Sequence, residues 1–246
     1  MTDPGPSTVA TRLAKRVSSL RPETAQVPHG DSSVPTGLLA NLREHLARGD
    51  THYTTRPGIT ELRSSIGGEI RKRGGPDRGA DGVIVTHGEG EAFFVTLLGL
   101  GMGAESIVVV AGDCHHRGLL DLLGIEVVGP HDPKAGNAQA FYREVGENLG
   151  GSAPVVRDGC FEILSLGDLL FSEKPGEADL SSLSKHTVVV GHFDSLPGLG
   201  HFRMAYVAGP PELVKRIQAW KQALSICSAA PSQRAAMFAI SKERVS

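Results

Sequence analysis

Short apolar runs alternate with longer amphipathic segments over most of the chain after residue 82. The runs are rich in β-branched residues and are predicted to be buried strands, at 83–86, 107–110, 125–128, 155–156, 187–190 and 204–207. Helices are predicted between them, over 91–101, 116–123, 137–149 and 211–228. This alternation predicts an α/β domain in three layers, with a mainly parallel sheet flanked by helices.

The first 82 residues follow a different pattern. Residues 1–34 contain many helix breakers and are predicted to form an N-terminal arm, which leaves 35–246 as one domain. Two amphipathic helices are predicted next, on either side of residues 49–58. Their apolar faces consist of Leu38, Leu39, Leu42 and Leu46 in the first helix, and of Ile59, Leu62, Ile66 and Ile70 in the second.

Composition narrows the range of partners. The chain has 246 residues, 40% of them apolar, and 25 basic residues against 27 acidic ones, so no strong field would attract nucleic acid or an anionic membrane. The most apolar stretch, 92–110, is interrupted by three glycines and a glutamate, and no transmembrane segment is predicted. Three scattered cysteines without metal-type spacing, Cys114, Cys160 and Cys227, favour a reducing cytoplasm and are expected to be buried.

A glycine-rich turn joins a predicted strand to a predicted helix at residues 86–92. Gly88 and Glu89 stand where backbone amides and the positive end of the helix dipole form a cradle for an anion. Turns of this kind are common, and Glu89 could instead serve as an ordinary helix cap. The turn alone therefore leaves both interpretations open.

Histidines gather after the predicted strands. His87, His115, His131, His192 and His201 all lie at or just beyond predicted strand ends. Because parallel strands end at one edge of a sheet, these residues indicate a polar pocket there, with imidazoles available for acid/base chemistry. Hydrogen bonding within loops is the alternative role. No known metal-binding signature occurs, and Lys215, Arg216 and Lys221 are expected on the solvated face of a helix.

Taken in order, these segments resemble the large domain of the class I and II aminotransferases, which belong to the fold-type I pyridoxal-phosphate (PLP) superfamily. The resemblance covers roughly residues 25–242. The segment from Tyr53 through Gly58 to Arg63 is similar to the family's Tyr-x-x-x-x-Gly-x-x-x-Leu-Arg pattern. It implies that Tyr53 reaches the cofactor phosphate of a partner subunit, and therefore a homodimer.

Other positions are given roles by the same resemblance. The turn at Gly88 and Glu89 is similar to the turn that cups the cofactor phosphate, and His115 or His116 falls where an aromatic residue stacks on the cofactor ring. Asp132 stands in place of the asparagine that binds the phenolic oxygen. Asp158 matches the aspartate that pairs with the pyridine nitrogen, with Phe161 replacing a tyrosine three residues later.

The stretch from Gly191 to Pro210 resembles the Ser-x-x-Lys motif that is followed eight positions later by the phosphate-binding arginine. In this register His192 replaces the serine, Ser195 replaces the lysine and Arg203 is retained. Because the chain ends at Ser246, the resemblance further implies that the small C-terminal domain of the family is missing.

Serine can neither hold the cofactor covalently nor shuttle protons as lysine does. We therefore expect a degenerate aminotransferase-like protein that does not transaminate and needs no cofactor. The pocket would be reused for PLP-independent acid/base chemistry, a cyclisation, isomerisation or elimination, on a small molecule in a biosynthetic pathway. His115, Asp158, His192 and His87 are the candidate acid/base groups, and Arg203 would hold an anionic group.

Three alternatives remain open from the sequence. The first is a noncatalytic or regulatory pseudoenzyme that pairs with a complete aminotransferase through the Tyr53 side. The second is a lysine-less enzyme that binds PLP or its pyridoxamine form (PMP) noncovalently, with His192 or His201 substituting for the lysine. Metal binding by the histidines is the third.

Overall fold

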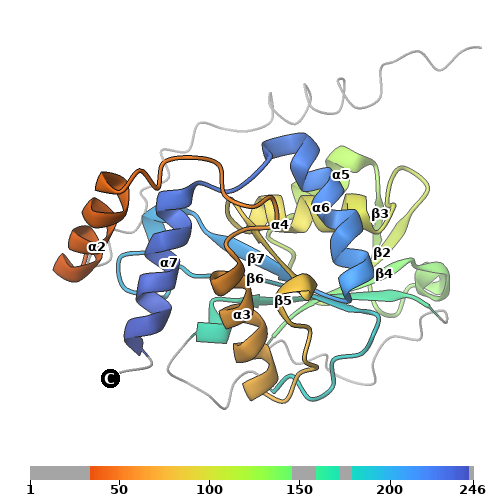
Figure 1. Cartoon of the computed structure of the whole chain (residues 1–246). Coiled ribbons are helices and arrows are strands. Elements are labelled where there is room, and N and C mark those ends of the chain that lie inside the picture. Colours follow the sequence, from red (N-terminus) through yellow and green to blue (C-terminus); the bar gives the residue numbers. More distant parts are fainter. Residues whose placement is uncertain (1–33, 146–158, 172–178, 244–246) are drawn as a thin grey trace, which may run out of the picture.

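The computed structural model describes residues 34–145, 159–171 and 179–243 (Figure 1). All but the last residue of the predicted N-terminal arm, 1–34, lies outside this range, and so does the predicted strand at 155–156.

A seven-stranded sheet lies at the centre of the described residues (Figure 1). Its strands are β1 (Val83–Thr86), β2 (Ile107–Val110), β3 (Glu126–Val128), β4 (Ala140–Glu144), β5 (Phe161–Gly167), β6 (Thr187–His192) and β7 (Ala205–Ala208). They are arranged in the order β1-β7-β6-β5-β4-β2-β3. Only β7 runs antiparallel to its neighbours β1 and β6, while the other pairs are parallel. Six strands therefore end at the same edge of the sheet, and β7 begins there.

Helices cover both faces of the sheet, as the alternating pattern predicts. They are α2 (Thr36–Ala47), α3 (Thr60–Lys72), α4 (Glu89–Gly99), α5 (Arg117–Leu123), α6 (Pro211–Ser225) and α7 (Ala230–Glu243). Buried side chains of α2, α3 and α7 form the core on one face, and those of α4, α5 and α6 form the core on the other. The predicted three-layer α/β architecture is confirmed.

The helix predicted over 137–149 is wrong. After a short 3-10 turn, η2 (Pro133–Asn137), the chain forms the central strand β4, which pairs with β2 and β5. Phe141 and Tyr142 point to opposite faces and are both buried, at 8% and 1% exposure. Burial on both faces suits a central strand and not a surface helix. The following strand, β5, was not predicted.

Burial corrects three further expectations. In α2, Leu38 and Leu42 are buried, but Leu39 and Leu46 are 45% and 44% exposed. Lys221, expected on the solvated face of α6, is completely buried. The three cysteines are free thiols and only partly buried. Within the described residues, no helix combines the length and apolar character needed to cross a membrane.

Candidate functional site

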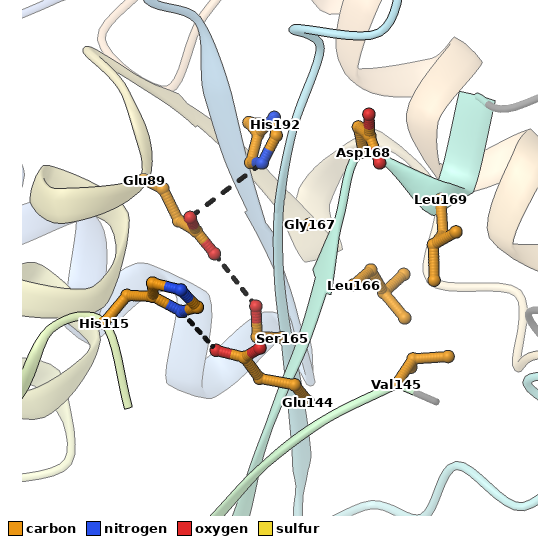
Figure 2. A pocket seen from close by; sticks show the side chains of 10 residues that line it. All are labelled: Glu89, His115, Glu144, Val145, Ser165, Leu166, Gly167, Asp168, Leu169 and His192. Carbon is orange, nitrogen blue, oxygen red and sulfur yellow. Dashed lines mark hydrogen bonds and ion pairs between the residues drawn. The ribbon is translucent and has the colours of Figure 1, made fainter. Parts of the chain in front are cut away.

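A pocket of about 360 Å³ opens at the edge where the parallel strands end (Figure 2). Residues from the start of α4, from the loop after β2 and from the ends of β4, β5 and β6 line it. They are Glu89, His115, Glu144, Val145, Ser165, Leu166, Gly167, Asp168, Leu169 and His192. The polar edge that the histidines indicate is therefore present, although carboxylates contribute as much to it as imidazoles do.

Glu89, the first residue of α4, extends its carboxylate into this pocket (Figure 2). Its Oε1 accepts a hydrogen bond from the Ser165 hydroxyl at 2.9 Å, and its Oε2 lies 3.4 Å from His116 Nε2 and 4.0 Å from His192 Nε2. Burial alone would raise the pKa of Glu89, but His116, Ser165 and His192 together outweigh it and hold the pKa below its usual value. Glu89 is therefore a charged group inside the pocket.

His192, the last residue of β6, lies between two carboxylates. Its Nε2 faces Glu89, and its Nδ1 is 3.4 Å from Asp194 Oδ2. The pKa of Asp194 is raised, chiefly by burial, with the charges of Asp168 and Glu89 acting in the same direction, while His192 and Arg203 oppose the shift. The two carboxylates beside His192 thus have pKa values shifted in opposite directions.

A second imidazole–carboxylate pair lines the same pocket. His115 Nδ1 lies 3.0 Å from Glu144 Oε1, which also accepts a hydrogen bond from the Tyr142 hydroxyl at 2.8 Å. The hydrogen bond to Glu144, followed by the charge of Glu144, raises the pKa of His115. The imidazole is 75% exposed, so this pair forms the solvent-facing rim.

The neighbouring histidine, His116, takes the deeper position. Its ring stacks on Phe93 of α4, with 5.3 Å between centroids and 29° between planes. Its Nε2 is buried and close to Glu89, without hydrogen-bond geometry to any described residue. Of the two histidines considered for ring stacking, His115 lines the pocket and His116 packs beneath it.

Arg203 lies beside the turn that precedes α4. A Cβ built on Gly88 would be 3.9 Å from Arg203 Nε and 4.0 Å from its Nη2, and Gly88 adopts a φ of 79°. Arg203 itself is left-handed, with φ 48° and ψ 55°, and is exposed. It forms no ion pair with a described residue. The structure therefore brings together the arginine and the glycine turn that the sequence assigns to an anion.

The other expected pocket residues are distributed differently. Ser195 is exposed, and its hydroxyl contacts the Asp168 carbonyl at 3.5 Å, next to the pocket. Asp132 caps η2 by accepting a hydrogen bond from the Lys134 amide and does not line the pocket. Asp158 lies outside the described residues.

His87 and Tyr53 belong to a separate cavity of about 450 Å³, which Cys227 also lines. His87 Nδ1 is 3.2 Å from Glu91 Oε2, and its amide donates to the same oxygen at 2.6 Å. His87 therefore does not join His115 and His192. Tyr53 is 82% exposed.

Sequence reasoning missed the pocket residues Glu144, Ser165 and Asp168, and also Asp194, which contacts His192. Glu144 and Asp168 stand at the ends of β4 and β5, so recognising those strands would have identified both residues. Asp168 precedes Phe171 by three residues, the same spacing as that of Asp158 and Phe161. Among the described residues, no group of three or more histidines, cysteines and carboxylates is arranged to hold a metal ion.

Comparisons with known proteins agree with this architecture. No protein-family model matches the sequence. A (5-formylfuran-3-yl)methyl phosphate transaminase of Methanocaldococcus jannaschii is 22% identical, and the match covers 89% of this chain and 64% of the relative. The chain thus spans less than two thirds of that curated relative's length.

Solved structures of aminotransferases superpose on most of the chain. A variant of Thermus thermophilus aspartate aminotransferase gives a TM-score of 0.72 at 19% identity, covering 94% of this chain and 71% of the enzyme. An aromatic aminotransferase from Pyrococcus horikoshii gives 0.68 at 18% identity, covering 86% of this chain and 65% of the enzyme. The chain therefore has the fold of the large domain of the fold-type I aminotransferases.

Proposed function

We propose that this protein uses His192 for PLP-independent acid/base chemistry on a small anionic molecule. The position of His192 between Glu89 and Asp194, on the wall of the 360 Å³ pocket, carries the proposal. An imidazole titrates near neutral pH and can therefore both accept and donate a proton under cellular conditions.

The electrostatics beside His192 support this role. Glu89 is stabilised as a carboxylate, whereas Asp194 is shifted toward its protonated form. Carboxyl groups whose environments separate their pKa values are typical of acid/base sites. In the proposed reaction His192 exchanges a proton with the substrate and Glu89 stabilises its imidazolium form. The Asp194 amide, which donates a hydrogen bond to His192 Nδ1 at 3.3 Å, orients the ring.

The substrate would be oriented by its anionic group. Arg203 and the amides at the start of α4 lie beside Gly88, which directly precedes the pocket residue Glu89. The paired His115 and Glu144 form the rim. An isomerisation, cyclisation or elimination needs this kind of fixed proton acceptor and anion anchor.

The pocket fits only part of the PLP cofactor that the fold implies. Gly88, with no side chain, and Arg203 suit a phosphate group. The covalent anchor is not matched, because Ser195 replaces the lysine and no lysine is among the described residues that line the pocket. These two observations support the proposal that the protein does not transaminate, although its relatives are named as transaminases.

Proton exchange with solvent tests this proposal and requires no identified product. The protein is incubated in deuterated water with a panel of phosphorylated and carboxylated carbonyl compounds, and deuterium incorporation at carbon is followed by NMR. We expect wild type to exchange at least one compound and His192→Gln to be slower by about 10²–10⁴-fold. His131→Gln, a change in an exposed histidine outside the pocket, is the matched control. Equal exchange by wild type and His192→Gln would overturn the acid/base role.

A second candidate function, which is incompatible with repulsion of a phosphate by Glu89, is noncovalent use of PLP or PMP. The approach of Arg203 to Gly88 favours it, since the phosphate contributes much of the binding of such cofactors. The protein is mixed with each cofactor, desalted and examined by absorbance. A chromophore retained at stoichiometric amounts supports this candidate, and its loss on desalting excludes tight noncovalent binding.

Assembly as a homodimer is also proposed. Tyr53, which the resemblance assigns to the partner's pocket, is 82% exposed and free to contact another subunit. Sedimentation equilibrium of wild type and Tyr53→Ala tests this assembly. A monomeric wild-type protein would contradict it.

A further inference from the structure

We propose that Glu89 closes the pocket to phosphate-bearing cofactors, because it places a fixed negative charge at the turn where their phosphate would bind. Glu89 is then the residue that determines which anions this site accepts. The inference concerns binding alone, so it can fail or succeed independently of the acid/base function.

Glu89 lies at the start of α4, next to the glycine turn. It follows Gly88 directly and begins α4, so its backbone belongs to the amide cradle while its side chain enters the pocket. A carboxylate at a helix N-terminus is stabilised by the same amides and dipole that would otherwise attract a phosphate. Glu89 thus adds a negative charge to the first turn of α4, where a phosphate would also be attracted.

The carboxylate is also held in place. Ser165 donates to one oxygen, and His192 lies near the other (Figure 2). His116 Nε2 lies 3.4 Å from that second oxygen. The Glu89 side chain is 22% exposed, which leaves it little freedom to swing into solvent. A ligand phosphate at Gly88 would therefore meet a partly buried charge of the same sign, which surrounding water screens weakly.

Arg203 makes the effect of Glu89 specific. It lies within 4.0 Å of a Cβ built on Gly88 and forms no ion pair with a described carboxylate. Because Glu89 follows Gly88 directly in the chain, we expect attraction by Arg203 and repulsion by Glu89 to act together on a phosphate bound at this turn. A singly charged carboxylate ligand would be tolerated better than a phosphate dianion, because the repulsion grows with ligand charge.

Glu89 and Ser195 act on opposite ends of a pyridoxal cofactor. Replacement of lysine by Ser195 removes the covalent bond but leaves phosphate binding possible. Glu89 would weaken phosphate binding itself, so the two residues together would remove both attachments of the cofactor. Either residue alone would leave the cofactor one of these two attachments, the covalent bond or the phosphate contact.

Binding of PLP to Glu89→Gln tests the inference, with affinity measured by isothermal titration calorimetry. Glutamine keeps the size of the side chain and removes its charge. We expect Glu89→Gln to bind PLP at least about tenfold more tightly than wild type. The added substitution Arg203→Ala should abolish the gain. Glu144→Gln, which removes another pocket carboxylate away from α4, is the control and should give a smaller gain.

Three outcomes would overturn the inference. They are equal PLP affinity in wild type and Glu89→Gln, an equal gain in Glu144→Gln, and a wild-type protein that retains PLP through desalting. Thermal unfolding of each variant shows whether it is folded. If Glu89→Gln does not fold, Glu89→Ser is measured in its place.

A covalent readout provides an independent check. In Ser195→Lys, the lysine amine can condense with the PLP aldehyde and release water, and borohydride then supplies hydride to fix the product. We expect Glu89→Ser combined with Ser195→Lys to be labelled at least about tenfold more at limiting PLP than Ser195→Lys alone, measured by intact mass. Equal labelling would show that Glu89 does not obstruct the cofactor.

Discussion

The Glu89 carboxylate accepts a 2.9 Å hydrogen bond from the Ser165 hydroxyl, across 76 positions of sequence. This contact joins the first turn of α4 to the end of β5 and fixes a charged group at the centre of the pocket. Ser165 is therefore the hydrogen-bond partner of Glu89, and its surroundings keep the carboxylate charged. Neither feature can be predicted from the glycine-rich turn alone.

Gln233 of α7 is expected to be essential for the segment that carries Tyr53. Its buried amide accepts from Ile59 N at 2.7 Å and donates to Thr54 Oγ1 at 2.9 Å and to the Ser228 carbonyl at 2.8 Å. Gln233→Leu leaves buried polar groups unpaired and should lower the free energy of unfolding by roughly 2–4 kcal/mol in urea denaturation. Gln222→Leu, which removes only a solvent-exposed hydrogen bond, is the control, and similar losses in both variants would contradict the prediction.

Two buried tyrosines should respond oppositely to loss of their hydroxyl. The Tyr206 hydroxyl is fully buried without a hydrogen-bond partner among the described residues, so Tyr206→Phe should leave stability unchanged or raise it by about 1 kcal/mol. The Tyr142 hydroxyl donates to Glu144, so Tyr142→Phe should lower stability by about 1–2 kcal/mol. Chemical denaturation measures both, and equal losses would refute the comparison.

Glu91 should make stability depend on acid pH. Burial alone would raise its pKa, but hydrogen bonds from His87 and Ser225 and the charge of buried Lys221 lower it to about 2. Because the pKa of Glu91 is lower in the folded state than its unfolded-state value near 4.5, the ionised carboxylate stabilises the fold fully at pH values above 4.5. This stabilisation is lost as the pH falls from 4.5 toward 2. The contribution is on the order of 2–3 kcal/mol.

Denaturation of wild type and Glu91→Gln between pH 7 and pH 2 measures this contribution. The stability difference between the two proteins should shrink as pH falls. Exposed Glu105→Gln is the control and should track wild type throughout. A difference that does not change with pH would contradict the role of the Glu91 charge.

His115 should lose its raised pKa when Glu144 is neutralised. Glu144→Gln removes the charge that faces His115 Nδ1, so the pKa of His115 should move down toward its usual value. NMR titration of the imidazole protons measures the shift. An unchanged pKa would show that the pair does not form in solution.

The sequence predicted the fold well in segments where a single pattern of apolar residues is clear. Continuous apolar runs identified β1, β2 and β6, and amphipathic spacing identified α2, α3 and α6. The segment at 137–149 failed because its alanine, glutamine and glutamate favour a helix locally. Pairing with β2 and β5 and burial on both faces outweigh that preference in β4.

Only the location of the site, at the edge of the sheet where the parallel strands end, could be predicted from the sequence. Strand ends indicated that His115 and His192 would meet, and the motif spacing brought Arg203 to Gly88. The partner of His115 comes from a segment that carries no such signal, because Glu144 ends the unpredicted strand β4. The partner of His192, Asp194, lies only two residues further along the chain, but its contact with the ring depends on how the chain turns after β6.

The reversed direction of β7 has a consequence for how this site can vary. Because β7 begins where β6 ends, the single connection of residues 193–204 holds both Ser195, beside Asp168, and Arg203, beside Gly88. An insertion between Ser195 and Arg203 would move Ser195 away from Asp168 or Arg203 away from Gly88. A substitution would leave the spacing of the two residues intact. Homologues with new specificities should therefore differ in the side chains of this connection and preserve its length.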